Sequence, residues 1–245
     1  MALTTVITVC HNSSKTIRDT IDSVAMQSVP VMHLFKDGGS SDLTVNIISS
    51  STHPLKLVEG KDGGIYDAMG IALNLVDTPY FVFLNSDDYF VSAEIVEAVE
   101  QEFSRSSADA VMCGIQMVNQ EGRVVRKWSA KSLSRLNVFT PQIAHPGLFV
   151  RTAFVRSRGI SIDPELRIAA DLKFQLQLME QGAIFTKLDV ISTTMRMGGA
   201  STSSFKSMSL GWLESFRVYN EVVGRGGLLF TFFKVVRKLL DVRLR

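Results

Sequence analysis

The chain has 245 residues, of which 46% are apolar, and this is enough for one sizeable hydrophobic core. Its formal net charge of +2 is too small to indicate nucleic acid as a partner. Cys10 and Cys113 lie far apart and have no partners at metal-ligand spacing, so neither a disulfide scaffold nor a zinc site is expected. This cysteine usage fits a reducing cytoplasm. Residues 1–10 are apolar but lack the basic leader and the length of a secretory signal, and they are interpreted as a strand of the mature fold.

Apolar runs rich in β-branched residues alternate with segments of helical periodicity through the first hundred residues. Strands are predicted at Thr4–Cys10, Val31–Lys36, Leu55–Val58 and Tyr80–Leu84, and helices at Ser14–Ser28, Leu43–Ser50 and Ile65–Val76. This alternation predicts an α/β fold with a mainly parallel central sheet and helices on both faces. Ligands of such sheets bind outside the carboxyl ends of the strands.

Polar residues gather where these predicted strands end. Asn12 follows the first strand, Asp37 the second, Asp62 the third, and the run Asn85–Asp88 the fourth. The adjacent carboxylates of Asp87 and Asp88 repel each other, and they are tolerated best where water, a divalent cation or hydrogen-bond donors face them. The sequence therefore predicts a binding site at this edge of the sheet.

The pattern changes after about Ser104. Strands are predicted at Ala110–Gln116 and Gly122–Lys127 with a turn at 120–122, followed by a helix at Ile168–Gln181. No internal repeat or Gly/Ser linker separates the two halves, so one domain of residues 1–226 is expected, with halves of about 1–104 and 105–226. The second half is expected to shape the site of a second substrate.

Residues 227–245, "GLLFTFFKVVRKLLDVRLR", predict a basic amphipathic helix. The uninterrupted apolar run is much shorter than the roughly 20 residues that cross a bilayer. Such a helix can lie in the membrane interface, or it can dock on its own domain or on a partner chain. An apolar helical face does not distinguish lipid from protein, so both interpretations stay open.

Four ordered motifs, "VITVCHNS", "KDGGSSDLT", "DGGIYDAM" and "FLNSDD", together resemble the N-terminal half of the family 2 glycosyltransferases, which have the GT-A fold. The resemblance is to four motifs over roughly Thr4–Asp88, with weaker likeness as far as Arg196. It implies that the first half of the domain holds a nucleotide-sugar donor and the second half shapes the acceptor site. The implied contacts to base and ribose are Val9, Cys10, His11, Asn12 and Asp37, and Asp62 and Asp67 are implied nearer the ribose and phosphates.

Carboxylates suit this task because they accept hydrogen bonds from the N–H groups of uracil or guanine and from ribose hydroxyls. Local alternatives exist for two of them. Asp37 precedes Gly38-Gly39 and could be only an Asx-type turn residue, and Asp67 could be only an acid in the first turn of a helix.

A diphosphate leaving group needs a hard cation, and the resemblance implies Mg²⁺ or Mn²⁺ held by Asp87. Asp87 stands at the third position of the family's aspartate-any-aspartate motif, whereas Asn85 replaces the first aspartate. Asn85 is expected to contact the donor, where its amide can still hydrogen-bond the ribose, and Ser86 and Asp88 are expected beside it. The alternative is that Asp87 and Asp88 cap a helix beginning near Ser92.

A second acid is needed to take the proton of an acceptor hydroxyl. The resemblance makes Asp171 this base, although many family members have a Glu-Asp pair where this chain has Ala170-Asp171. Asp171 could instead be only a helix N-terminal acid. His145 in "HPGLFVR" is expected to contact acceptor or pyrophosphate, and Arg196 a phosphate, next to a loop with the glycines of "MRMGGASTS".

These features together imply a metal-dependent, inverting glycosyltransferase that moves a sugar from a UDP- or GDP-linked donor to a saccharide or polyprenyl-linked acceptor in bacterial polysaccharide biosynthesis. It would work in the cytoplasm or at the inner face of the cytoplasmic membrane. A sugar-1-phosphate nucleotidyltransferase is the alternative enzyme, but it would need a Gly-rich loop where residues 10–13 read Cys-His-Asn-Ser. Asn85 and Ala170 also leave open a non-catalytic nucleotide-sugar-binding module. The sugar, the base and the acceptor are not determined by the motifs.

Overall fold

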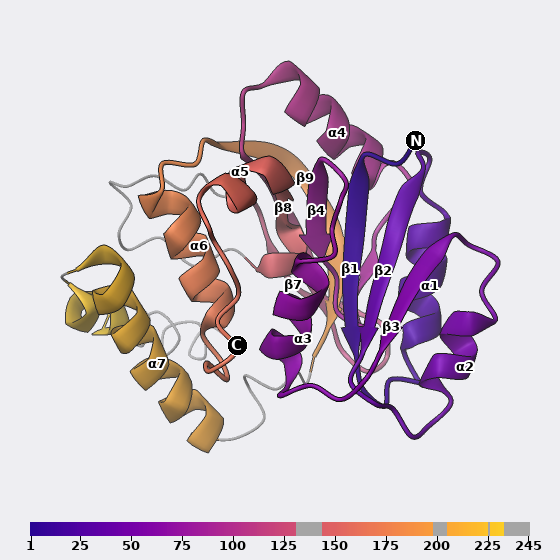
Figure 1. Cartoon of the computed structure of the whole chain (residues 1–245), viewed down its shortest axis with the longest axis horizontal. Coiled ribbons are helices and arrows are strands. Elements are labelled where there is room, and N and C mark those ends of the chain that lie inside the picture. Colours follow the sequence, from indigo (N-terminus) through magenta and orange to yellow (C-terminus); the bar gives the residue numbers. More distant parts are fainter. Residues whose placement is uncertain (131–143, 198–204, 225, 233–245) are drawn as a thin grey trace.

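The computed structural model describes residues 1–130, 144–197, 205–224 and 226–232 (Figure 1). In these residues, one nine-stranded sheet has the order β3-β2-β1-β4-β8-β6-β9-β5, and β7 pairs with β6. The strands are β1 (Thr4–Cys10), β2 (Val31–Asp37), β3 (Leu55–Glu59), β4 (Tyr80–Phe83), β5 (Tyr89–Phe90), β6 (Ala110–Val118), β7 (Val124–Trp128), β8 (Leu148–Arg151) and β9 (Phe185–Arg196). The helices are α1 (Ile17–Ala25), α2 (Thr44–Ser49), α3 (Ile65–Leu73), α4 (Ile95–Arg105), α5 (Thr152–Ser157), α6 (Ala170–Glu180), α7 (Phe205–Val223) and the 3₁₀ turn η1 (His145–Gly147).

The first half of the sheet is parallel, as predicted. β1 lies between β2 and β4, and β2 pairs with β3 on its other side. In this register Cys10 is opposite Asp37, and Asp37 is opposite Glu59, so the carboxyl ends of β1, β2 and β3 lie level. The polar residues that follow these strands therefore meet at one edge of the sheet.

The second half is attached mainly by antiparallel pairs. β8 joins β4 to β6, and the hairpin of β6 and β7 turns at 119–123, where Gly122 donates to the Asn119 carbonyl at 3.1 Å. β9 runs parallel to β6 over most of its length and pairs with the two-residue strand β5. We did not predict the strands β5, β8 and β9, which are short or of mixed polarity, or the helix α7. The partners of these elements are far away in the sequence.

Strand β4 explains why five uncharged residues precede the run Asn85–Asp88. Phe81 and Phe83 belong to the core on the face covered by α3 and α6, whereas Val82 and Leu84 belong to the core on the face covered by α1 and α4. Successive side chains of a strand point to opposite faces, so a strand buried on both sides favours uncharged residues along its length. The charged residues begin where the strand leaves these two cores.

The C-terminal part, which consists of α7 and residues 226–232, packs on α6 through α7 (Figure 1). After α7, residues 227–232 are again helical, and the Phe230 ring stacks on Tyr219 at 4.6 Å between centroids. Five apolar side chains in this part are largely exposed: Leu213, Phe216, Leu228, Leu229 and Phe232. None of the described helices is both long and apolar enough to cross a membrane. The rest of the predicted tail helix, 233–245, lies outside the described residues.

Candidate active site

The loop after β1 is tied to the loop after β2. Asn12 has a φ of 51°, in the left-handed region that Asn tolerates better than most residues. Its Oδ1 accepts from the Ser41 N–H at 2.9 Å, and its own N–H donates to Ser40 Oγ at 2.8 Å. His11 and Asn12 are exposed at this edge, whereas Val9 and Cys10 are buried. Burial raises the pKa of the Cys10 thiol, so this side chain stays protonated.

The Asp37 carboxylate, which is buried, caps the turn that follows it. Its Oδ2 accepts from the Gly39 and Ser40 N–H groups, each at 2.8 Å, and its Oδ1 accepts from the Ser40 hydroxyl and weakly from Cys10 Sγ. Burial alone would raise the pKa of Asp37, but the hydrogen bonds from Ser40 and Gly39 outweigh it and lower that pKa. The Asx-type turn role is therefore present, and a contact to a nucleotide base stays a prediction.

Lys36 was not predicted as part of the site. Its side chain is buried, and Nζ donates to Asp62 Oδ2 at 3.0 Å, to the Gly60 carbonyl at 2.6 Å and to the Asp37 carbonyl at 2.7 Å. A Cβ on Gly38 would lie only 2.9 Å from Asp62 Oδ2, so glycine permits this approach. A lysine near the end of an otherwise uncharged strand was the signal in the sequence, because buried lysines are almost always paired.

The Asp67 carboxylate stabilises the start of α3. Its Oδ2 accepts from the Gly63 N–H at 2.8 Å, and Gly64, with a φ of 128°, occupies the N-cap position. This is the local helix-acid role that remained open for Asp67. Its predicted contact to ribose or phosphate stays a prediction.

The run Asn85–Asp88 follows β4 and contains two different carboxylates. Asp88 is 1% exposed and accepts from Asn85 Nδ2 at 3.2 Å. Burial first, and then the charge of Asp87, raise the pKa of Asp88 well above its ordinary value. Asp87 is only half-buried, so of this pair it is the acid accessible to a ligand.

The residues of this run suit a hard cation. Asn85 Oδ1 is buried and has no hydrogen-bond partner among the described residues. Together with the Asp87 carboxylate it provides oxygen ligands of the kind that Mg²⁺ and Mn²⁺ take. The described residues contain no group of three or more His, Cys, Asp or Glu that could hold a metal by themselves, so further ligands would have to come from the donor's phosphates and from water.

Residues at the ends of two other strands contact the run Asn85–Asp88. The Ser86 and Ser13 hydroxyls are 2.8 Å apart, which joins it to the loop after β1. Arg196, the last residue of β9, donates from Nη1 to the Asp87 carbonyl at 3.1 Å and forms an ion pair with Asp19. Arg196 therefore lies beside the candidate metal ligand, and its contact to a phosphate stays a prediction. The loop of residues 198–204 that follows lies outside the described residues.

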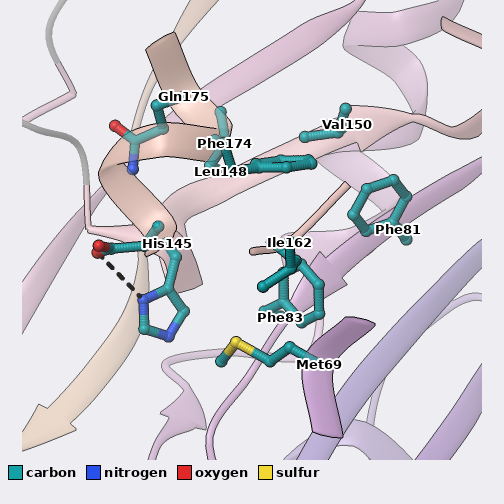
Figure 2. Close-up of a pocket in the computed structure, with 10 residues that line it drawn as sticks. Met69, Phe81, Phe83, His145, Leu148, Val150, Ile162, Phe174 and Gln175 are labelled. Atoms are coloured by element: carbon teal, nitrogen blue, oxygen red, sulfur yellow. Dashed lines mark ion pairs between the residues drawn. The ribbon is translucent and has the colours of Figure 1, made fainter. Parts of the chain in front are cut away.

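His145 and Asp171 come together at the other side of the site. His145 Nδ1 is 3.9 Å from Asp171 Oδ2, and the dashed line in Figure 2 marks this pair. Both side chains are about one-fifth exposed, at 20% and 18%. Asp171 is in the first turn of α6, where its Oδ1 accepts from the Leu172 N–H at 2.7 Å. The two predicted acceptor-side residues are thus neighbours.

A small apolar pocket lies beside this pair (Figure 2). Its volume of about 10 Å³ is room for about one water. Its walls include Met69 of α3 and Phe83 of β4. Met69 and Phe83 lie two residues from Asp67 and Asn85 in the sequence, so walls of the pocket come from the elements next to the donor-side motifs.

Tyr66 of α3 is a further residue that the sequence patterns did not indicate. Its hydroxyl donates to the Ile168 carbonyl at 2.9 Å, three residues before Asp171. Burial first, and then the charges of Asp171 and Glu214, raise the pKa of the Tyr66 hydroxyl. Tyr66 therefore joins the helix that begins at the donor side to the loop that enters α6.

A mainly parallel sheet of this order, with helices on both faces and carboxylates at the ends of its parallel strands, is the architecture of the GT-A fold. The chain matches the Glycosyl transferase family 2 model over residues 5–159, and it belongs to that family. The predicted family and fold are thus confirmed.

The curated relatives of the chain include bacterial glycosyltransferases. The chain is 25% identical over 181 residues to the poly(ribitol-phosphate) beta-N-acetylglucosaminyltransferase TarS of Staphylococcus aureus, covering 70% of this chain and 31% of TarS. It thus spans about a third of the length of that relative. It is also 25% identical over 190 residues to a PGL/p-HBAD biosynthesis glycosyltransferase of Mycobacterium bovis, covering 75% of this chain and 73% of that protein.

Solved structures show the same fold. Residues 1–349 of S. aureus TarS in complex with UDP-GlcNAc superpose with a TM-score of 0.71 at 21% identity, covering 90% of this chain and 67% of that one. The mannosyltransferase PcManGT of Pyrobaculum calidifontis, in complex with GDP-Man and Mn²⁺, gives a TM-score of 0.66 at 14% identity, covering 95% and 68%.

Proposed function

We propose that this chain transfers a sugar from a UDP-linked donor to a hydroxyl of a saccharide or polyprenyl-linked acceptor, with inversion, in the synthesis of a bacterial surface polysaccharide. The observation that supports the proposal is the placement of the His145–Asp171 pair at a pocket whose other walls include residues of α3 and β4, the helix that carries Asp67 and the strand that precedes Asn85. UDP is preferred to GDP because the TarS structures similar to this chain contain UDP-GlcNAc or UDP.

The donor would lie over the carboxyl ends of β1, β2 and β4. Asp37, with His11 and Asn12 beside it, would receive the uracil and ribose, exchanging an internal hydrogen bond for one to the nucleotide. Asp62 and Asp67 would lie nearer the ribose and phosphates. Lys36 already compensates the charge of Asp62, so the anionic donor meets less repulsion than these carboxylates alone would cause.

Asp87 and Asn85 would hold a divalent cation, with Ser86 and Asp88 supporting the run around them. When bound, Mg²⁺ or Mn²⁺ stabilises the negative charge that develops on the leaving diphosphate. Arg196, which already contacts the Asp87 carbonyl, would add a second positive charge there.

Asp171 would act as the general base. The acceptor oxygen attacks the anomeric carbon, the bond from that carbon to the diphosphate oxygen breaks, and Asp171 takes the hydroxyl proton. His145 lies close enough to orient the carboxylate and to contact the acceptor. Inversion follows from a single displacement on the face opposite the leaving group.

Two single substitutions test the proposal. We expect Asp87→Asn to lose the Mn²⁺-dependent gain in UDP affinity, because the variant removes an anionic ligand. We expect Asp171→Asn to keep UDP affinity but to lower sugar transfer by about 10²-fold or more, the usual scale for a general base. Calorimetry with UDP and Mn²⁺, and UDP release from UDP-GlcNAc with a panel of saccharide acceptors, measure the two effects.

The exposed residue Asp77 provides the control, since Asp77→Asn should change neither quantity. Normal transfer by Asp171→Asn would remove Asp171 as the base. Formation of pyrophosphate from UTP and a sugar 1-phosphate would instead indicate the nucleotidyltransferase, and UDP binding without turnover of any donor would indicate a binding module.

We also propose that the chain works at the inner face of the cytoplasmic membrane. Leu228, Leu229 and Phe232 are 77%, 50% and 60% exposed, and the sequence beyond them adds five basic residues against one acid. Exposed apolar side chains next to a basic segment favour an anionic lipid surface. A partner chain on this surface is the competing occupant.

A further inference from the structure

Helix α6 carries the proposed base but lacks a cap of its own. Ala169 occupies the N-cap position, and its side chain makes no capping hydrogen bond. Alanine is a poor N-cap because it has no oxygen for the free N–H groups of the first turn. The main-chain N–H groups of residues 167–169, which lead into α6, take their acceptor from another part of the chain.

Glu214 of α7 is that acceptor. Its Oε1 accepts from the Arg167 N–H at 3.0 Å, and its Oε2 accepts from the Ile168 and Ala169 N–H groups at 2.8 and 3.0 Å. Glu214 is 9% exposed. Three hydrogen bonds to one buried carboxylate are strengthened by its charge, and a negative charge at a helix N-terminus is favoured by the helix dipole.

The same peptide is fixed from two further directions. The Tyr66 hydroxyl donates to the Ile168 carbonyl at 2.9 Å. On α7, a Cβ at Gly211 would lie 3.0 Å from Ile168 Cγ2, so glycine allows this close approach of the helix. Residues 167–169 are thus held between α3, which begins at the donor side, and α7.

We propose that Glu214 is a positioning residue for sugar transfer. It does not touch a substrate; it fixes the main chain of residues 167–169 and through it the place of the Asp171 carboxylate beside His145. The proposal rests on the proposed function, in which Asp171 takes the acceptor proton. It makes α7, which lies beyond the region matched to the family, part of the catalytic apparatus.

Glu214→Gln is the sharpest variant. It has nearly the same shape, but its amide offers one accepting oxygen in place of two, so at least one N–H of residues 167–169 faces an NH₂ group. Glu221→Gln is the matched control on the same helix, because Glu221 accepts from the Lys173 side chain and not from this main chain. Glu214→Ala removes all three bonds and should have a larger effect.

Three measurements on the full chain decide the question. For Glu214→Gln, we expect amide hydrogen exchange at residues 167–169 to become about ten-fold faster. Turnover of UDP-GlcNAc should fall about ten-fold to a hundred-fold, the scale of a misplaced catalytic group, while calorimetric affinity for UDP stays within about two-fold. Glu221→Gln should match the parent in all three quantities.

Unchanged exchange or unchanged turnover in Glu214→Gln would overturn the proposal, as would a loss of turnover matched by an equal loss of UDP affinity, which indicates a general structural defect. A parent protein that turns over no donor refutes the proposed function, and this inference with it. A parent that is active while Glu214→Gln is equally active refutes the inference alone.

Discussion

The carboxylates at the strand ends differ in the hydrogen bonds and ion pairs that they already form within the protein. Asp62 forms an ion pair with Lys36, and Asp37 accepts hydrogen bonds from the turn that follows it. Asp88 is buried and accepts a hydrogen bond from Asn85. Asp87 accepts none of the described side-chain hydrogen bonds and is the carboxylate left for a ligand. One residue type at one edge of the sheet therefore has several roles, decided by the donors around it.

Asp37→Asn should make the free energy of unfolding less dependent on pH in the acidic range. The folded pKa of Asp37 is lowered, so its ionised form contributes stability above the ordinary value for aspartate, and this contribution is lost as pH falls through the lowered pKa. We expect the variant to unfold with a free energy about 1–3 kcal/mol smaller at pH 7, because an amide cannot accept from all of these donors.

Urea unfolding from pH 7 down to pH 2 measures this difference, which should shrink as the pH falls below about 4. Asp77→Asn, at an exposed position, should change the free energy of unfolding by less than about 0.5 kcal/mol. A constant difference for Asp37→Asn at all pH values would show that the carboxylate charge is not what holds the turn.

Among the elements, η1 is placed by close contact with β6. A Cβ on Gly147 would lie 2.7 Å from the Cys113 carbonyl oxygen, so the strand leaves no room for a side chain there. Thr193 of β9 also donates to the Pro146 carbonyl at 2.9 Å. His145, at the start of η1, therefore takes its position from two strands of the sheet.

Gly147→Ala is expected to lower the free energy of unfolding by about 1–3 kcal/mol, because the added methyl forces η1 away from β6. It should also reduce turnover of UDP-GlcNAc, since His145 moves relative to Asp171. Thermal unfolding and UDP-release assays measure the two effects.

Gly70→Ala in α3 is the control for this substitution. Its Cβ would meet the nearest atom, the Ile162 carbonyl oxygen, at 3.6 Å, an ordinary contact. Alanine also favours a helix over glycine by about 1 kcal/mol, so the variant should be as stable as the parent or more stable. Equal behaviour of the two alanine variants would show that η1 can shift freely.

At the scale of the whole molecule, the C-terminal part has two tasks. Its inner side places Glu214, Tyr219 and Phe230 against the domain, where Phe230 is 7% exposed. Its outer side presents Leu213, Leu228 and Phe232. A deletion that tests membrane binding must therefore begin after Phe232, because removing Phe230 would also open the core.

We expect the full chain to co-sediment with anionic phospholipid vesicles and less with neutral ones. The five basic residues beyond Phe232 contribute roughly 1 kcal/mol each near an anionic surface, so binding should weaken with salt. Deletion of residues 233–245 should reduce vesicle binding at least ten-fold and leave UDP affinity unchanged.

Substitution of the five basic residues by glutamine is the matched variant, because it keeps the chain length and removes only the charge. Equal binding of the full and shortened chains to anionic vesicles would refute the membrane role. A concentration-dependent dimer that the deletion abolishes would assign this surface to a second copy of the chain.

Four ordered motifs carried the resemblance to the family. The alternation of strands and helices in the first half, and the edge where polar residues meet, could be predicted from residue patterns alone. These depend on local properties: side-chain periodicity of two or 3.6 residues, and polar residues directly after buried strands. Thr4–Cys10 and Tyr80–Phe83 are strands because both faces are covered, and their residues show this without knowledge of the partners.

Which groups contact one another became evident only in the folded protein. Lys36 reaches Asp62 across 26 positions, Glu214 reaches Ala169 across 45, and Tyr66 reaches Ile168 across 102. No periodicity marks these pairs, because a hydrogen bond between distant segments depends on how the sheet and helices pack. Lys36 shows by its place in an apolar strand that it needs a partner, but the sequence does not show which residue that partner is. The strands β8 and β9 escaped prediction for the same reason: a strand of four residues, or one of mixed polarity, is defined by the neighbour with which it pairs.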